Sequence, residues 1–333
     1  MIINPAIIAL ILGSLMISAF AFYALATAFR ILKHWDVRSG SEVQVALERK
    51  TYLISTIFSY LLGFELFSLL LFVYTADHIH DLFVGAMCAA GSLNVNNYGY
   101  PTLILKIITF MFCGVWMIIN YTDNRACDYP LIRPKYKLLI LLTVLIGVET
   151  FFQTNYFTGL MADVITSCCG TLFSDETRGI SGEMASLPPH SMRIAFYLSV
   201  ILTLRVGIHV LVTGRGATAF GLLSGVSTVV SLAAVVSFIS PYYYELPTHH
   251  CPFCLLQKEY HFIGYPLYLS LFLAGITGMG AGIIDRLKGP HQSLSKVIPV
   301  LQKRLSVLSM TGFTTFAGIA TYPMMFGDFR LVF

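Results

Sequence analysis

The chain has 333 residues, of which 56% are hydrophobic and only 11% are charged, and its formal net charge is +4. Soluble domains carry about 25% charged residues, so this composition excludes an ordinary soluble protein and predicts an all-α polytopic membrane protein. The positive charge does not indicate nucleic-acid binding, because the basic residues fall between apolar segments, where they orient helices across a membrane.

Eight apolar runs reach the length of about 20 residues that a membrane-spanning helix needs. They lie roughly at 5–29, 52–74, 101–121, 137–156, 192–213, 217–240, 262–284 and 304–323. The first run lacks the basic leader and small-residue cleavage site of a signal peptide, so we expect it to remain as a helix. The prediction is a single integral-membrane domain over residues 1–333, surrounded by membrane lipid.

The loops between these runs differ strongly in positive charge. One set of alternate loops holds fifteen lysines and arginines, and the opposite set holds three. Because positively charged loops stay in the cytoplasm, both termini are expected outside, as in a bacterial inner-membrane protein whose functional face is periplasmic. The outer loops are then 75–100, 157–191 and 241–261.

Five of the seven cysteines fall in these three outer loops. They are Cys88 in the first loop, Cys168 and Cys169 in the second, and Cys251 and Cys254 in the third. Disulfides persist and exported thiols are managed on the outer side of the membrane. The distribution therefore predicts that these cysteines form one outer site.

The first outer loop, 75–100, is too short and too rich in glycine and asparagine to span. We expect an interfacial or re-entrant element, since irregular backbone at membrane depth needs protein or water around it. Asp77, His78 and His80 open the loop. They either belong to the outer site or are solvated residues that cap the second span.

The second outer loop carries the adjacent pair Cys168–Cys169. A disulfide between neighbouring cysteines closes a strained eight-membered ring, so each thiol is expected to serve a different partner.

The third outer loop contains the most informative stretch, THHCPFCLLQKEY, residues 248–260. If this C-x-x-C begins a helix, the helix dipole lowers the pKa of Cys251 and makes it nucleophilic, and Pro252 suits the first helical turn. His249 and His250 add nitrogens that ligate metals. The residue types fit dithiol–disulfide exchange or ligation of a soft metal such as Cu(I) or Zn(II), while a passive structural disulfide is the simpler alternative.

The stretch CPFCLLQK, 251–258, followed by GYPL, 264–267, resembles the redox motif of the DsbB-type membrane disulfide-bond oxidoreductases. In that family a dithiol passes electrons to a membrane quinone, and a second cysteine pair exchanges with a soluble thioredoxin-like protein. The resemblance implies that Cys251 and Cys254 are the quinone-proximal pair. It also implies that Lys258, next to Gln257, replaces the arginine that contacts the quinone. The likeness is confined to this stretch, and the family has fewer spans than are predicted here.

Several ionisable residues fall inside the predicted spans, where they are costly and usually face a partner or a cavity. They are Glu65, Lys106, Glu149, Arg205 and His209. They fit a proton path or a quinone pocket. They equally fit interhelical ion pairs, for example Glu149 with Arg205.

Three functions are compatible with these patterns. The first is a thiol–disulfide oxidoreductase that couples a periplasmic thioredoxin-like partner to quinone, with Cys251 attacking, Cys254 resolving and Cys168 or Cys169 relaying. The second is a metal-binding or metal-delivery protein that exchanges Cu or Zn with a metal-carrying partner. Its ligands would be drawn from Cys88, Cys168, Cys169, Cys251, Cys254, His249 and His250. The third is a structural subunit of a larger membrane assembly, with disulfides joining its outer loops.

Overall fold

The structure, a computed structural model, shows an all-helical membrane protein and confirms the predicted fold class. It describes residues 4–37, 39–126, 128–161, 164, 166, 187–289 and 292–329.

Seven helices in the described part of the chain are long and apolar enough to cross a membrane, and each coincides with a predicted span. They are α1 (Pro5–His34), α2 (Glu42–His78), α4 (Gly99–Asp123), α5 (Ile132–Thr158), α8 (Pro189–Thr213), α9 (Ala217–Ala234) with its continuation to Tyr244, and α11 (Gly264–Leu287). The eighth predicted span lies within α12 (Val297–Phe326). An eighth crossing, and the orientation of all the helices, stay predictions.

Shorter helical elements lie in the segments that join the long helices, except that η2 and α10 form the continuation of α9 to Tyr244. They are η1 (His80–Leu82), α3 (Ala89–Leu93), the π-helical turn η2 (Val235–Ile239), α10 (Ser240–Tyr244), η3 (Cys254–Leu256), η4 (Lys258–Tyr260) and η5 (Gln292–Leu294).

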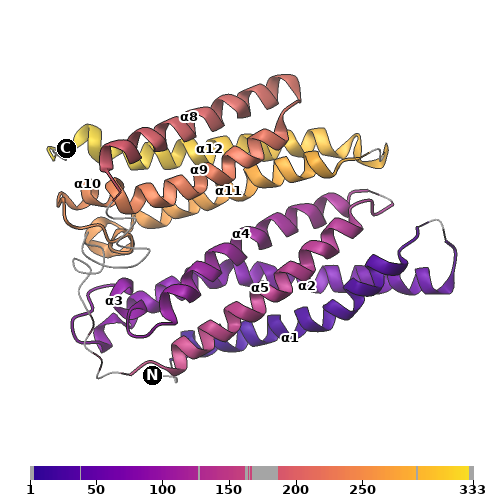
Figure 1. The fold of residues 1–333 in the computed structure, drawn as a ribbon, viewed down its shortest axis with the longest axis horizontal. Helices are drawn as coiled ribbons and strands as arrows, with labels where there is room; N and C mark the ends of the chain where they lie inside the picture. The colour runs from indigo at the N-terminus through magenta and orange to yellow at the C-terminus, as the bar shows by residue number, and fades with distance from the viewer. Residues whose placement is uncertain are drawn as a thin grey trace. The chain divides into compact units, whose positions relative to one another are not determined.

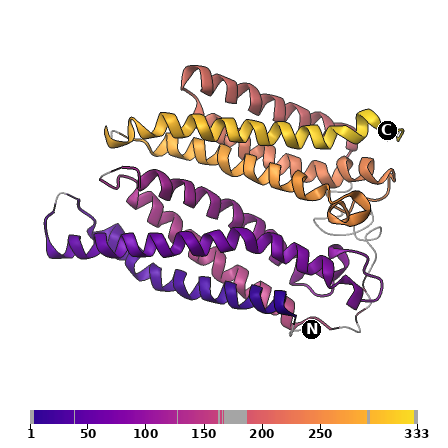
Figure 2. The same cartoon turned by 180° about the vertical axis from the view of Figure 1, so that it is seen from behind.

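The chain divides into two compact units, each built around four long helices (Figures 1 and 2). The first unit comprises Met1–Thr75, Asn96–Leu160 and Arg286–Leu301, and it contains α1, most of α2, α4 and α5. The second unit comprises Ala76–Val95, Met161–Asp285 and Gln302–Phe333, and it contains α8, α9, α11 and most of α12. Two outer loops of the sequence analysis, 75–100 and 241–261, thus contribute to the second unit.

Local sequence sets several helix ends. The Asn4 side chain accepts a hydrogen bond of 2.9 Å from the Ala6 amide, and Pro5 occupies the first turn of α1, where its missing N–H is not needed. Gly214 ends α8 with a φ of 67°, a left-handed conformation that favours glycine.

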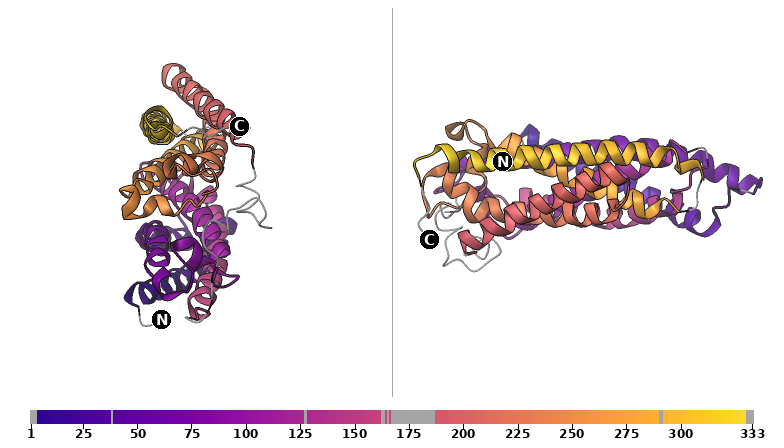
Figure 3. Two further views of the ribbon diagram at one scale, coloured as in Figure 1. Left: turned by 90° about the vertical axis from the view of Figure 1, so that its left-hand side faces the viewer. Right: turned by 90° about the horizontal axis from the view of Figure 1, so that it is seen from above.

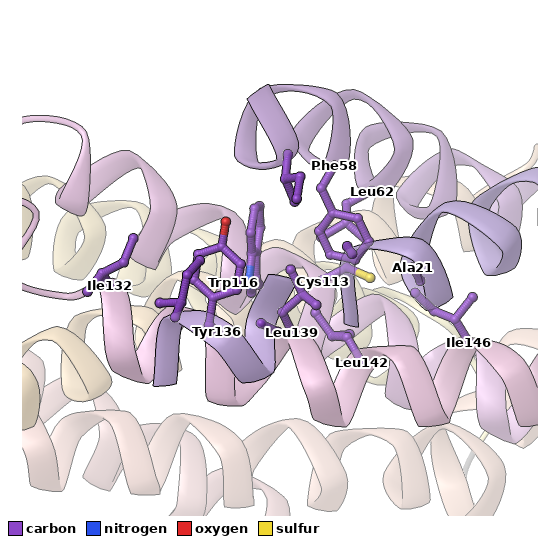
Figure 4. Close-up of a cluster of buried hydrophobic side chains, with 14 of the residues drawn as sticks. Ala21, Phe58, Leu62, Cys113, Trp116, Ile132, Tyr136, Leu139, Leu142 and Ile146 are labelled. Atoms are coloured by element: carbon purple, nitrogen blue, oxygen red, sulfur yellow. The ribbon is translucent and has the colours of Figure 1, made fainter. Parts of the chain in front are cut away.

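The first unit has a core of large side chains between its helices (Figure 4). The Phe58 ring from α2 meets the Trp116 ring from α4 edge-on, with 5.1 Å between centroids. The Trp116 indole N–H donates to the carbonyl of Lys135 at 3.1 Å, which joins α4 to α5. Cys113, beside Trp116 in this cluster, is fully buried.

The second unit relies on small residues where helices touch. A Cβ added at Gly282 of α11 would lie 2.7 Å from the Cα of Gly221 in α9. A Cβ added at Gly221 would likewise lie 2.7 Å from the Cα of Gly282. Thr203 of α8 and Ser227 of α9 share a hydrogen bond of 2.7 Å. In α12, Ser309 donates to the Ala274 carbonyl at 2.8 Å, and Figure 3 shows α12 running lengthwise with its neighbours. Close backbone approach of this kind is typical of helix packing in membranes.

Replacing Gly282 by valine is expected to destabilise the second unit by about 1–3 kcal/mol, the usual cost of overpacking a tight contact. The added carbons would push against backbone atoms, which cannot move aside as a flexible side chain can. Thermal unfolding in detergent micelles measures the effect. Gly318→Val is the matched control, because no atom lies within 4 Å of a Cβ at Gly318. Equal melting temperatures for the two variants would contradict the prediction.

Candidate metal centre

Three cysteine sulfurs meet in the second unit. Cys88 Sγ lies 3.5 Å from Cys251 Sγ, and the sulfurs of Cys88, Cys251 and Cys254 all lie within 4.8 Å of one another. Their exposed fractions are 0%, 0% and 6%. A disulfide bond is about 2.05 Å long, so Cys88 and Cys251 touch without being bonded. Two segments that are 163 residues apart in sequence therefore build one buried thiol cluster.

A carboxylate and an amide hold the Cys88 segment against the C-x-x-C segment. Asp77 Oδ1 accepts hydrogen bonds from the Ala89 amide at 3.2 Å and from Gln257 Nε2 at 3.3 Å. The same Gln257 nitrogen donates to the carbonyl of Met87 at 2.9 Å. The residues on either side of Cys88 are thus tied to a side chain three positions after Cys254.

Two tyrosines fix the backbone of the C-x-x-C motif itself. Tyr244 donates its hydroxyl hydrogen to the Cys251 carbonyl at 2.5 Å, and Tyr268 donates to the Pro252 carbonyl at 2.8 Å. Tyr244 comes from α10 and Tyr268 from α11. The motif is therefore anchored to helices on both sides of it.

The C-x-x-C motif does not begin a long helix, so the condition under which a helix dipole would act on Cys251 is not met. Cys254 opens only the three-residue turn η3, and Gln257 then adopts extended backbone with ψ of 161°. His261 and Phe262 follow with φ of 54° and 56°, and α11 begins at Gly264. Because a single 3₁₀ turn aligns few peptide dipoles, the argument that a helix dipole activates Cys251 does not hold.

His250 is oriented by an irregular turn of the preceding helix. Its Nδ1 lies 2.9 Å from the carbonyl oxygen of Val236, which belongs to the π-helical turn η2. A carbonyl only accepts, so Nδ1 carries the hydrogen and Nε2 has a lone pair. A backbone carbonyl on the far ring nitrogen is the usual support of a metal-ligating histidine.

His249 presents a buried ring nitrogen that has no partner among the described residues. Its Nε2 is shielded from solvent and makes no hydrogen bond there, while the ring packs edge-on against Tyr244 with 4.5 Å between centroids. Burial lowers the pKa of His249, although the nearby Cys88 opposes this shift. The neutral imidazole, which is the form that ligates metals, is therefore favoured.

The remaining predicted site residues lie elsewhere. Lys258 is exposed to solvent, and Gln257 serves the hydrogen bonds described above. Cys168 and Cys169 lie outside the described residues. The relay and ligand roles assigned to these two cysteines stay predictions.

The spacing of the three sulfurs fits coordination by one metal ion. Zn–S bonds are about 2.3 Å long, so thiolates around a tetrahedral zinc stand about 3.8 Å apart. The Cys88–Cys251 separation of 3.5 Å and the upper bound of 4.8 Å on all three separations are compatible with that value. Thiolates select soft or borderline ions such as Cu(I) and Zn(II) over Mg²⁺ and Ca²⁺.

Sequence reasoning brought Cys88 together with the C-x-x-C motif but missed the residues that hold them in place. Asp77 was noticed only as one member of a polar group, and Tyr244 and Tyr268 were not identified. Tyr244 follows Pro241 within PYYYELP, and Tyr268 lies in an apolar run. Neither position carries a spacing signal that predicts a contact with Cys251 or Pro252.

Comparison with known proteins adds no family to this description: no family model, curated protein or solved structure matches the chain. The fold and site define an integral-membrane helical protein with a buried three-cysteine cluster.

Proposed function

We propose that the protein binds one thiophilic metal ion, Zn(II) or Cu(I), through Cys88, Cys251 and Cys254, in a membrane metal-binding or metal-delivery role. The convergence of three buried sulfurs within 4.8 Å carries this proposal. Thiolates buried without a compensating charge would repel one another and lose their hydration. A cation at their centre compensates that charge.

His249 and His250 are the candidates for a fourth ligand by their place beside Cys251, although neither ring nitrogen belongs to the group of atoms that lie within 4.8 Å of one another. His249 has a shielded Nε2 without a partner in the described structure, and the hydrogen bond of His250 to Val236 leaves its Nε2 lone pair available. A three-sulfur, one-nitrogen set is a common structural zinc site. Three sulfurs alone suit Cu(I), which accepts soft ligands.

Metal analysis of the purified chain tests the proposal. We expect about one equivalent of Zn(II) or Cu(I) per chain after reconstitution under reducing conditions, with metal–sulfur distances near 2.3 Å by X-ray absorption. The double variant Cys251→Ser, Cys254→Ser should bind none. Cys113→Ser should bind as the parent does, because that thiol belongs to the core of the first unit. A parent protein that retains neither ion would refute the proposal.

Thiol–disulfide exchange is the second candidate, favoured by the contact of Cys88 Sγ with Cys251 Sγ. Cys251 could then form a disulfide with Cys88 or with Cys254, releasing two electrons and two protons. A membrane quinone would take up both and become a quinol. The resemblance to DsbB-type oxidoreductases supports this reading at the motif itself.

Counting reactive thiols separates the two candidates. A bound metal protects three thiols until a chelator removes it, and a reductant that does not bind the metal has no effect. A redox disulfide removes two thiols, and only the reductant restores them.

In both cases we propose that the cluster faces the outer, periplasmic side of the membrane, because the bias of lysine and arginine in the sequence favours that side for these loops. A metal-carrying or thioredoxin-like partner would bind there.

A further inference from the structure

A second cluster of reactive side chains lies in the first unit. Lys106 of α4 places its Nζ 2.7 Å from Glu149 Oε1 of α5 and 3.5 Å from Glu65 Oε1 of α2. Its ammonium group also donates to Ser68 Oγ at 2.9 Å. The three charged side chains are 1–2% exposed. Where the sequence suggested Arg205 as a partner for Glu149, the structure provides Lys106.

The charges in this cluster do not balance if every group is ionised. Two carboxylates face one ammonium group inside membrane-spanning helices. Among the described residues, the Cys113 thiol of α4 also interacts with these groups, and it adds no positive charge. A buried carboxylate without a compensating charge is strongly disfavoured. One additional positive charge is therefore required.

The hydrogen bonding shows the same deficit. Glu65 Oε2 and Glu149 Oε2 are both buried, and neither has a hydrogen-bond partner among the described residues. The two side chains nevertheless interact directly with each other. A proton on one Oε2 turns that oxygen into a donor and leaves the other as its acceptor. A single proton held by the two carboxyl groups thus neutralises the excess charge and gives a buried oxygen a hydrogen to donate.

We propose that Glu65 and Glu149 together bind one proton, and that Lys106 limits the site to one. The ligand is a proton rather than a metal cation, because a metal ion here would lie beside the Lys106 ammonium and be repelled by it. The site lies within the first unit and does not depend on any role of the cysteines. It gives the membrane-spanning helices a buried proton-binding group.

Infrared spectroscopy of the full-length protein at neutral pH tests the proposal. A protonated carboxyl group has a C=O stretching band that a carboxylate lacks, and ¹³C-labelled glutamate identifies the band as that of a glutamic acid. We expect the intensity of one such group per chain in the parent. The band should disappear in Glu65→Gln and equally in Glu149→Gln, because the remaining carboxylate is then balanced by Lys106.

Lys106→Met gives the sharpest result. Without the ammonium group both carboxyl groups must be neutral, so the intensity should double. Glu42→Gln, at an exposed position, should leave the band unchanged. The parent spectrum decides the question even if a variant fails to fold. No band in the parent at neutral pH would overturn the proposal, as would a band that survives both single glutamine substitutions.

Discussion

Replacing Cys88 by serine is expected to weaken metal binding by about 100-fold. Four-ligand zinc sites have apparent binding energies of about 10–16 kcal/mol, so one ligand contributes about 3 kcal/mol, which corresponds to that factor in Kd. Cys88 lies 163 residues from Cys251, yet its sulfur is 3.5 Å away. The loss should therefore be comparable to that caused by Cys254→Ser. Competition with a chelator of known affinity, on the full chain in detergent, measures the change.

The matched control for this variant is Cys113→Ser, which removes another fully buried thiol from the chain. Cys113 packs with Phe58 and Trp116 in the core of the first unit. Its replacement can alter stability, but it should leave the metal affinity as it is. A Cys88→Ser protein that binds metal as tightly as the parent would remove Cys88 from the ligand set.

Replacing Asp123 by alanine is expected to destabilise the first unit by about 3–5 kcal/mol, the cost of leaving a buried charge without its partner. Asp123 Oδ2 lies 2.6 Å from Lys135 Nζ, and the two side chains are 0% and 1% exposed. Asp123 Oδ1 also accepts a hydrogen bond of 2.9 Å from the Leu131 amide. The substitution would remove both interactions where α4 turns into α5. Reversible unfolding in mixed micelles measures the loss.

A double replacement distinguishes the buried charge from the general effect of mutation. Asp123→Leu combined with Lys135→Met removes both charges and fills similar volume, so it should recover most of the lost stability. Glu42→Ala, at an exposed position, should change stability by about 0.5 kcal/mol or less. If Asp123→Ala were as stable as the exposed control, the Lys135 ammonium group would not depend on Asp123.

The proton site and the metal site make separable predictions. Cys88→Ser should leave the infrared band of the glutamic acid pair unchanged, and Glu149→Gln should leave the metal content unchanged. The residues of the two sites belong to different compact units. Failure of either proposal would leave the other standing.

The long helices were predictable because the requirement for a membrane-spanning helix, a continuous run of apolar residues, is local in sequence. A run of about 20 apolar residues such as 101–121 can be stable in lipid only as a helix or as part of a barrel, and α4 spans Gly99–Asp123 as expected. The ends were less predictable. The helix expected from residue 52 begins at Glu42, because polar residues can continue a helix beyond the apolar run.

The cysteine site was predictable only in part. The loops expected on one side of the membrane included both Cys88 and the C-x-x-C motif, and loops at the same ends of spans gather together. The local conformation was not predictable: the motif leads into a 3₁₀ turn and then to left-handed residues at His261 and Phe262 before α11 begins. Hydrogen bonds from Gln257 and Tyr268 to distant backbone atoms accompany that conformation.

The amino-acid sequence was enough to predict a helical membrane protein and to identify the loops that carry the thiols. Hydropathy and the distribution of charge depend on residues that are neighbours in the sequence, so the membrane spans and their loops can be predicted without the fold. Which polar groups meet became clear from the folded arrangement alone. The pairing of Lys106 with Glu65 and Glu149, and of Cys88 with Cys251, depends on how each helix is rotated toward its neighbours. That rotation is set by side-chain packing among residues far apart in the chain.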